Sequence, residues 1–263
     1  MDLELNGKKA FIGGSSRGLG YAAARILAEE GCHVVLNGRD KTNLEQAAAM
    51  INQGTSGKAS QVVGDAADPN QPKRLIQESV DILGGLDLLV TNTGGPPAGK
   101  FDSFDEETWQ RAINLAFMSH VRLINEALPH LKESNFASVL TVTSYSVKQP
   151  IPNLVLSNSI RSATVGLTKS LALELGSDGI RFNSILPGWT KTERVTEIMQ
   201  HRADQNGSSI DEEIKKITGE SPLGRMATPD EFGRAAAFLL SPAASYITGV
   251  MLTVDGGMYK GTN

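Results

Sequence analysis

The sequence contains very little cysteine and no long apolar run. A single cysteine, Cys32, among 263 residues excludes an internal disulfide framework and favours a reducing compartment. No stretch approaches the roughly 18 consecutive apolar residues of a membrane-spanning helix. The N-terminal residues also lack the apolar segment of a signal peptide. These absences predict a cytoplasmic protein.

Charge of one sign does not dominate, and aromatic residues are scarce. The 25 lysines and arginines are offset by 29 acidic residues, which gives a net charge of −4, and aromatic residues make up 5% of the chain. Without a basic excess or a polybasic run, the sequence favours neither a nucleic acid nor a membrane surface as partner. We predict no metal site, and expect the partner to be a small molecule.

The sequence does contain a regular alternation of strand-like and helix-like segments. The strand-like runs are apolar throughout, as expected when helices cover both faces of a sheet. Repeated units of this kind predict an α/β fold, a doubly wound parallel sheet of the Rossmann type flanked by helices. No linker or internal repeat divides the chain, so 1–263 is predicted to be a single domain. Strands are expected at 9–14, 33–39, 59–66, 86–95, 137–144, 180–188 and 249–257, and helices at 19–30, 41–52, 72–84, 105–133, 156–175 and 228–241.

Residues 191–226 interrupt this alternation. The segment is polar, includes the glycine-punctuated run "DQNGSS", and indicates two short helices. A long excursion after the carboxyl end of a strand is where a substrate lid would lie. We therefore expect 191–226 to form a small lid within the domain.

The run "GGSSRGLG", here called the glycine loop (13–20), follows the first predicted strand and opens the first predicted helix. Glycines permit a tight turn close to a diphosphate, and a helix N-terminus presents free N–H groups to that anion. A glycine turn without a ligand is the alternative. If a nucleotide binds, its contacts in the loop are expected to be Gly14, Ser16, Arg17, Gly18, Leu19 and Gly20.

Two arginines favour NADP as the cofactor. Many dinucleotide folds place an acid at the end of the second strand, but here the residue is Asn37, with Arg39 two positions on and Arg17 in the glycine loop. Guanidinium groups near the ribose 2′ position favour a phosphate there, and hence NADP over NAD. Ordinary surface arginines, with NAD as cofactor, are the alternative. Asp65, at the end of the third strand, is a candidate for the adenine amino group or for a turn cap.

Further strand ends carry residues suited to the same ligand. Asn92 follows the fourth strand and can hold the main chain beside a cofactor, while Gly94 lets the chain pass closely. After the sixth strand, the run "PGWTKT" offers a threonine hydroxyl for a nicotinamide carboxamide. Ligands of doubly wound sheets bind at such carboxyl ends. The contacts predicted here are Asn92, Gly94, Pro187, Gly188, Thr190 and Thr192.

These motifs together resemble the short-chain dehydrogenase/reductase family over about residues 3–258. The runs "GLTKSLALEL" and "PLGRMATPDEFGRAAAFLLSPAASYITGVMLTVDGG" resemble its 3-oxoacyl-carrier-protein reductase branch most closely. The resemblance implies that Asn114, in "INLAF", supports a proton-relay water and that Ser144, in "VTSYS", positions a carbonyl. It also implies a dimer or tetramer in which the two helices 105–133 and 156–175 pair across an interface, although core packing alone would give the same apolar stripe.

The family's Tyr-x-x-x-Lys pair is absent from this chain. The tyrosine position, thirteen residues after Ser144, is Ser157, and the lysine position is Arg161, which would still hold the cofactor ribose; "GLTKS" at 166–170 fixes this register. A serine hydroxyl is a poor proton donor, and we expect Arg161 to stay a fixed cation because the pKa of arginine exceeds about 12. Tyr145 is a candidate substitute acid, although it can instead face the lid or solvent. His120 and His130 are expected to be structural or solvated.

Two functions follow from this pattern. The first is an NADP-dependent oxidoreductase, similar to 3-oxoacyl-carrier-protein reductase, that transfers hydride between a nicotinamide and a carbonyl or alcohol with an atypical proton donor. The second is a dinucleotide-binding protein that has lost catalysis and acts as a sensor or partner subunit. The glycine loop, Asn114 and Ser144 favour the first function, and the missing Tyr–Lys pair favours the second.

Overall fold

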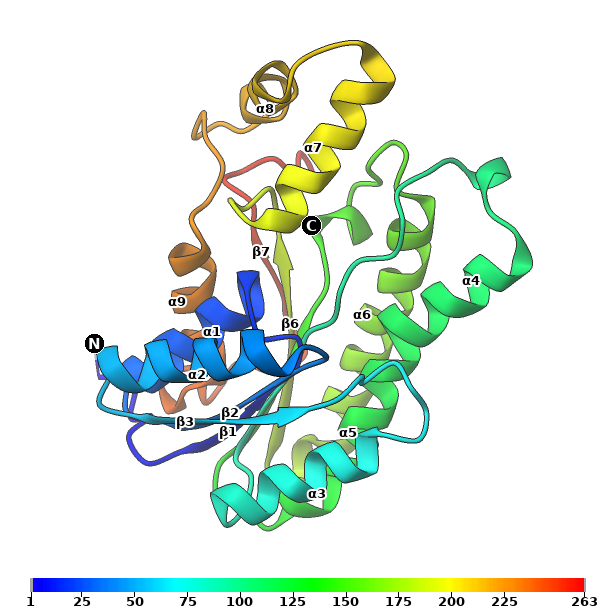
Figure 1. Cartoon of the computed structure of the whole chain (residues 1–263). Helices are drawn as coiled ribbons and strands as arrows, with labels where there is room; N and C mark the ends of the chain where they lie inside the picture. The colour runs from blue at the N-terminus through cyan, green and yellow to red at the C-terminus, as the bar shows by residue number, and fades with distance from the viewer. Residues whose placement is uncertain (1, 263) are drawn as a thin grey trace.

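A seven-stranded parallel sheet forms the centre of the protein, in a computed structural model that describes residues 2–262 (Figure 1). The strand order is β3-β2-β1-β4-β5-β6-β7, so the chain leaves β1 in one direction along the sheet and later resumes on its other side with β4. This doubly wound sheet confirms the predicted fold class. The strands are β1 (Lys9–Ile12), β2 (His33–Gly38), β3 (Lys58–Val63), β4 (Leu88–Thr91), β5 (Ala137–Val142), β6 (Ile180–Pro187) and β7 (Met251–Val254).

Helices cover both faces of the sheet, which explains why the strands are apolar throughout. Leu36 of β2 packs in one core with the helices on one face of the sheet, whereas its neighbour Val35 packs in a second core with the helices on the other face. Burial of both strand faces is the arrangement that the unbroken apolar runs predict. The helices are α1 (Gly18–Glu29), α2 (Lys41–Gly54) and α9 (Pro229–Leu240) on one face, and α3 (Pro72–Leu83), α5 (Ser119–Lys132) and α6 (Val155–Leu175) on the other.

The single long helix expected at 105–133 is wrong in detail. The chain forms α4 (Glu106–Ile113), a π-helical turn (Asn114–Met118) and then α5, within which Pro129 lies in the last turn. A π-helical turn frees main-chain carbonyls from the regular helical pattern. The carbonyl oxygen of Ala116, within this turn, accepts a hydrogen bond of 2.9 Å from the Thr164 hydroxyl of α6. The interruption is therefore stabilised by a neighbouring helix.

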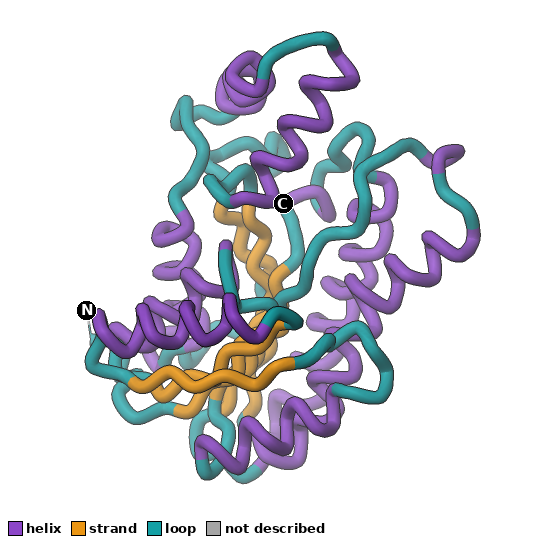
Figure 2. Tube along the Cα trace, viewed as in Figure 1, coloured by secondary structure: helices purple, strands orange, loops and turns teal. Residues whose placement is uncertain are grey.

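The segment 191–226 forms two helices, α7 (Glu193–Asn206) and α8 (Ile210–Gly219), as expected. They stand above the carboxyl edge of the sheet, where the loops that follow the strands gather (Figures 1 and 2). Thr192 caps α7, and Ser209 with Glu212 forms a capping box on α8. The helices are thus specified locally, by side chains that satisfy their first N–H groups. Across residues 2–262, no helix combines the length and apolar character needed to cross a membrane.

Candidate active site

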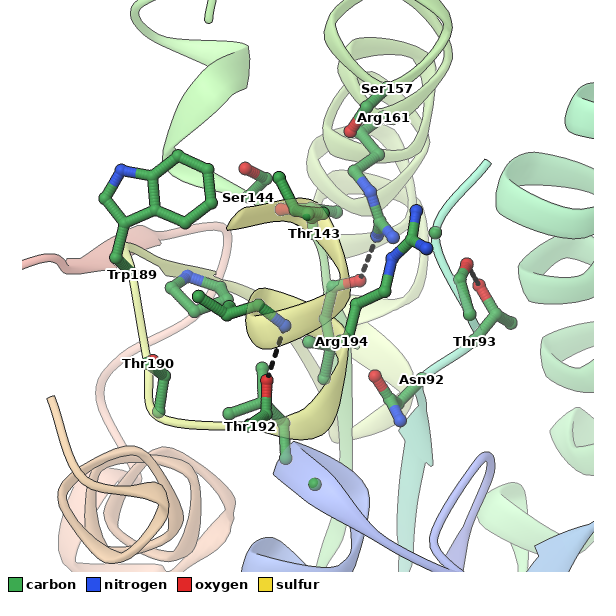
Figure 3. Close-up of a pocket in the computed structure, with 18 of the residues that line it drawn as sticks. Asn92, Thr93, Thr143, Ser144, Ser157, Arg161, Trp189, Thr190, Thr192 and Arg194 are labelled. Atoms are coloured by element: carbon green, nitrogen blue, oxygen red, sulfur yellow. Dashed lines mark hydrogen bonds between the residues drawn. The ribbon is translucent and has the colours of Figure 1, made fainter. Parts of the chain in front are cut away.

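A cavity of about 310 Å³ opens at the carboxyl edge of the sheet. It lies at the switch point between β1 and β4, where ligands bind in doubly wound folds. The glycine loop forms one end, called here the loop end. The first turn of α6 forms the other end, called here the α6 end, and the first turn of α7 borders the cavity along its side (Figure 3). The predicted site residues that line the cavity are Gly14, Arg17, Gly18, Leu19, Asn92, Gly94, Ser144, Tyr145, Ser157, Arg161, Pro187, Gly188, Thr190 and Thr192.

The glycine loop has no room for side chains where it turns. Gly14 and Gly18 have φ of +55° and +62°, a region that residues with a Cβ rarely adopt. A Cβ on Gly20 would lie 2.3 Å from the carbonyl oxygen of Gly14. The loop therefore forms a backbone cradle that opens onto the N-terminus of α1, whose first turn carries no acidic side chain. Such a cradle fits the diphosphate of a dinucleotide.

Asn92 ties the end of β4 to this cradle. Its amide Nδ2 donates hydrogen bonds of 3.2 Å and 3.0 Å to the carbonyl oxygens of Gly13 and Gly14. These bonds fix the loop against the neighbouring strand before any ligand arrives. A Cβ on Gly94 would meet nothing within 4 Å, so the protein itself does not require glycine there.

The residues proposed for the adenosine ribose lie near the loop end but differ in exposure and in whether the protein already uses their donors. Arg39 is exposed, and its Nη1 lies 4.0 Å from Asp65 Oδ2. Asn37 is buried, and its amide donates to the carbonyl oxygens of Val62 (3.0 Å) and Gly64 (3.2 Å). The donors of Asn37 thus serve the β2–β3 pairing, whereas the charge of Arg39 is available to a ligand.

Two further polar residues near the loop end have partners of their own. Arg17 forms an ion pair with Glu193, which joins the glycine loop to the first turn of α7. Asp65 Oδ1 accepts a hydrogen bond of 2.9 Å from the N–H of Ala67, which is the turn-capping role considered for it. Ser16, next to Arg17, is half-buried and does not line the cavity.

The residues after β6 connect the sheet to α7. A Cβ on Gly188 would lie 2.7 Å from the Cα of Asp255, so glycine is required where the chain crosses the end of β7. Thr190 is buried, and its hydroxyl lies 3.4 Å from the carbonyl oxygen of Gly188. Thr192 Oγ1 accepts a 3.4 Å hydrogen bond from the N–H of Val195, as part of the α7 cap. Both threonines border the cavity in Figure 3.

The structure brings Ser144, Ser157 and Arg161 to one wall at the α6 end (Figure 3). Ser144 follows β5, and its Oγ accepts a 3.1 Å hydrogen bond from the N–H of Ser146. Ser157 and Arg161 lie one turn apart on α6. The Arg161 side chain is 7% exposed, and its Nη1 donates a 3.1 Å hydrogen bond to the carbonyl oxygen of Val142.

Arg161 has a lower pKa than its sequence position indicated. Burial, followed by the positive charge of Arg194, lowers the pKa of Arg161 to about 10, which corrects the expectation of a value above about 12. The group still carries its proton at neutral pH. No carboxylate within residues 2–262 forms an ion pair with Arg161. The free-energy cost of keeping this charge buried is therefore not offset by a counter-charge.

Tyr145 lines the cavity but is 5% exposed. It packs in an apolar cluster with Ile151, Trp189 and Met199. Burial, and then the negative charge of Glu220, raises the pKa of Tyr145 to about 12, although a hydrogen bond with Trp189 opposes that rise. A phenol that is harder to ionise is a weaker acid, so these contacts do not favour Tyr145 as proton donor.

Asn114 is not brought into the cavity. Its Nδ2 donates to the carbonyl oxygen of Gln110 (3.1 Å), and its Oδ1 accepts from Arg122 Nη2 (2.9 Å). His120 is fully buried behind the α6 end, with its Nδ1 2.7 Å from the Thr91 hydroxyl oxygen. Burial, with Arg161 adding a smaller effect, lowers the pKa of His120 to about 3, so this histidine is neutral and structural.

Trp189 and Arg194 are among the cavity residues that the sequence did not predict. Trp189 lies between Gly188 and Thr190, on the loop that forms one wall. Arg194 lies in the first turn of α7, where its Nη2 donates a 3.0 Å hydrogen bond to the carbonyl oxygen of Pro96. The only sequence signal for Arg194 was its place two residues after Thr192. Arg194 reaches the cavity because of the direction in which α7 runs over it, and the local sequence does not show this direction.

A backbone cradle at the switch point of a doubly wound sheet is typical of dinucleotide-binding proteins. Comparison with known proteins identifies the family within this class. Residues 14–259 match the family described as "Enoyl-(Acyl carrier protein) reductase". The rabbit (Oryctolagus cuniculus) protein "Dehydrogenase/reductase SDR family member 4" is 32% identical over 256 residues, which cover 96% of this chain and 94% of that protein. The chain therefore belongs to the short-chain dehydrogenase/reductase family.

Solved structures agree with this assignment. L-sorbose reductase from Gluconobacter frateurii, complexed with NADPH and L-sorbose, has a TM-score of 0.94 and 30% identity, with coverage of 99% of this chain and 100% of that one. Actinorhodin polyketide ketoreductase with NADPH has a TM-score of 0.91 and 26% identity, with coverage of 97% and 98%. Both structures hold NADPH in a fold that matches this chain over nearly its whole length.

Proposed function

We propose that this protein is an NADP-dependent oxidoreductase that acts on a carbonyl or alcohol substrate. The observation that carries the proposal is one continuous cavity, in which the glycine cradle at one end faces Ser144, Ser157 and Arg161 at the other. A nicotinamide nucleotide bound there would supply or accept the hydride. Residues of this chain would position the carbonyl and stabilise the charge that develops on its oxygen.

The loop end supports binding of the cofactor. The cradle around Gly14 and Gly20 accepts a diphosphate, and Asn92 holds that cradle in place. The exposed guanidinium of Arg39 favours the additional phosphate of NADP, and the NADPH held by two structural neighbours supports the same choice. NAD is the alternative, and binding measurements separate the two.

The α6 end supports chemistry at a carbonyl oxygen. The hydroxyls of Ser144 and Ser157 can donate hydrogen bonds to that oxygen, and the charge of Arg161 stabilises the negative charge that develops on it. Fixed donors and charges of this kind are a large contribution to carbonyl chemistry in a site shielded from water. Because serine is a poor acid, we propose that solvent supplies the proton through the Ser157 hydroxyl.

The finer parts of the proposal rest on the family resemblance. They are an activity similar to 3-oxoacyl-carrier-protein reductase, assembly as a homodimer or homotetramer, and a cytoplasmic location. The ion pair between Arg17 and Glu193 supports the proposal that α7 and α8 act as a lid, because it connects the lid segment to the glycine loop.

A sensor or partner subunit is the second candidate. It is favoured by the serine at the tyrosine position and by the buried Tyr145, which together leave the cavity without an evident strong acid. Such a protein would bind the cofactor through the loop end and would not turn over any substrate. Cofactor binding alone therefore cannot separate the two functions.

A titration and a substrate screen test the proposal together. NADPH and NADH are titrated by fluorescence into the wild type, Arg39→Asp and Arg234→Asp, where Arg234 is an exposed control on α9. Arg39→Asp should weaken the binding of NADPH far more than the binding of NADH, and Arg234→Asp should weaken the binding of neither cofactor. Equal weakening of both cofactors by Arg39→Asp contradicts NADP. Turnover of any carbonyl or alcohol in the screen supports the enzyme, whereas tight NADPH binding without turnover favours the sensor.

A further inference from the structure

We propose that Arg161 and Arg194 together bind a carboxylate of the substrate, so that the carbonyl compound handled by this protein is an oxo acid. The inference rests on the proposed function and narrows its substrate class. In the direction of reduction, the carbonyl carbon gains a hydride and its oxygen gains a proton from solvent. The oxo acid becomes a hydroxy acid while the nicotinamide cofactor is oxidised.

The first observation is that the Arg161 guanidinium is buried and incompletely paired. A guanidinium has five N–H donors, and in the described chain Arg161 uses one of them, on Nη1, to bind the carbonyl oxygen of Val142. Within the described chain, no carboxylate forms an ion pair with it. A buried cation without a counter-charge costs free energy unless a partner arrives. Because Arg161 borders the cavity, a ligand can supply that partner. The cofactor ribose expected beside Arg161 is uncharged, so it can accept hydrogen bonds from the guanidinium but cannot supply the counter-charge.

The second observation is a second guanidinium on the opposite wall. Arg194 reaches from α7, donates to the carbonyl oxygen of Pro96 at 3.0 Å, and lies against Gly95. Figure 3 shows the Arg161 and Arg194 side chains, one from α6 and one from α7, converging on the same space. Their charges interact, since Arg194 disfavours the charged form of Arg161. An anion between them would relieve this repulsion.

The acidic side chains of the cavity do not neutralise this pair. Glu193 lies against Arg17, in an exposed ion pair at the loop end. Glu197 lies 3.4 Å from Arg194 Nη1, but both side chains are about half exposed, at 55% and 45%, so water screens the interaction. Neither acid forms an ion pair with Arg161. The α6 end therefore retains an excess positive charge.

The position of the pair identifies the anion as part of the substrate. The glycine cradle and the N-terminus of α1 already provide a place for the cofactor diphosphate. Arg161, by contrast, lies one helical turn from Ser157, which is proposed to hold the carbonyl oxygen. An anion bound by Arg161 must then be attached within a few atoms of that carbonyl. A planar carboxylate matches the fork of two guanidinium groups.

Binding of unreactive analogues tests the inference without turnover. Oxamate and malonamate are the amide analogues of a 2-oxo and a 3-oxo acid, and malonamide is an uncharged control. Each is titrated by calorimetry into the protein with and without NADPH. We expect at least one of the two carboxylates to bind and malonamide not to bind. Arg194→Gln should lower the affinity for that carboxylate by about 10- to 100-fold, which is the loss expected for hydrogen bonds to a charged group.

Matched variants separate the possible failures. Lys215→Gln removes one exposed charge from α8 in the same lid segment and should leave both affinities unchanged. Failure of both carboxylates to bind the NADPH complex overturns the inference and leaves the proposed function standing. If Arg194→Gln weakens NADPH and not the carboxylate, the arginine pair serves the cofactor diphosphate and the inference is also overturned. If NADPH itself fails to bind, the proposed function falls, and carboxylate binding to the protein alone still decides on the arginine pair.

Discussion

The loop end and the α6 end of the cavity owe their shapes to different parts of the chain. At the loop end, main-chain atoms of Gly14 and Gly20 meet the Asn92 amide so closely that no additional carbon fits. At the α6 end, the surface is formed by side chains on a helix, with Ser157 and Arg161 at the positions that we propose correspond to the family's tyrosine and lysine. A change of side chain there leaves the helix intact and alters the chemistry.

Under the proposed function, this difference explains how a chain can retain the cofactor-binding half of a dinucleotide site while its catalytic half changes. Binding of a diphosphate depends on backbone N–H groups and on the absence of side chains, so substitutions are tolerated poorly. Proton transfer depends on the acidity of one group, which substitution changes directly. The loop end therefore defines the class of ligand, and the α6 end defines what is done with it.

The largest effect is expected from a substitution in the cradle. Gly20→Val should abolish NADPH binding, because even the first added carbon would lie 2.3 Å from the Gly14 carbonyl oxygen and 2.8 Å from Asn92 Nδ2. Gly166→Ala is the control, since a Cβ on Gly166 of α6 would meet nothing within 4 Å. It should keep NADPH binding and raise stability by about 0.5–1 kcal/mol, the usual gain from replacing a helical glycine. Calorimetric titration measures the NADPH affinity, and urea unfolding measures the stability. Retained NADPH binding in Gly20→Val would contradict a rigid cradle.

Arg161 offers the next largest effect, at the opposite end. Arg161→Met should lower kcat/KM by about 10²–10³, because a fixed charge aimed at the developing oxyanion is lost. The free energy of unfolding should not fall, since methionine replaces a buried cation that has no carboxylate partner. Steady-state kinetics and denaturant unfolding are the measurements. A large loss of stability with little loss of activity would instead make Arg161 a structural residue.

The same contrast separates what the sequence predicted from what it did not. The cradle was predictable because its requirements are local: a strand, glycines at 14, 18 and 20, and a helix start within a few residues. The sheet was predictable because unbroken apolar runs indicate strands covered on both faces. Such features depend on neighbours in the chain.

The features that the sequence did not predict depend on distant contacts. The π-helical turn after α4 is stabilised by Thr164 of α6, 48 positions from the carbonyl that it binds. That turn alters which side chains share a face, and Asn114 pairs with Arg122 and does not reach the cavity. Arg194 enters the site because α7 folds back over the loop after β4. Neither event has a signature in the local residue pattern.

The smallest effects compare two hydroxyls of the α6 end. Ser157→Ala should lower kcat by about five- to tenfold, the value of one neutral hydrogen bond to the reacting oxygen. Tyr145→Phe should cause no measurable change, because the phenol is 5% exposed and its hydroxyl interacts with Trp189 and Glu220. Steady-state kinetics of both variants with one substrate, alongside NADPH titrations, make the comparison. Loss of turnover in Tyr145→Phe with unchanged NADPH affinity would identify Tyr145 as the acid, and the α6 end would then retain a tyrosine donor in a new position.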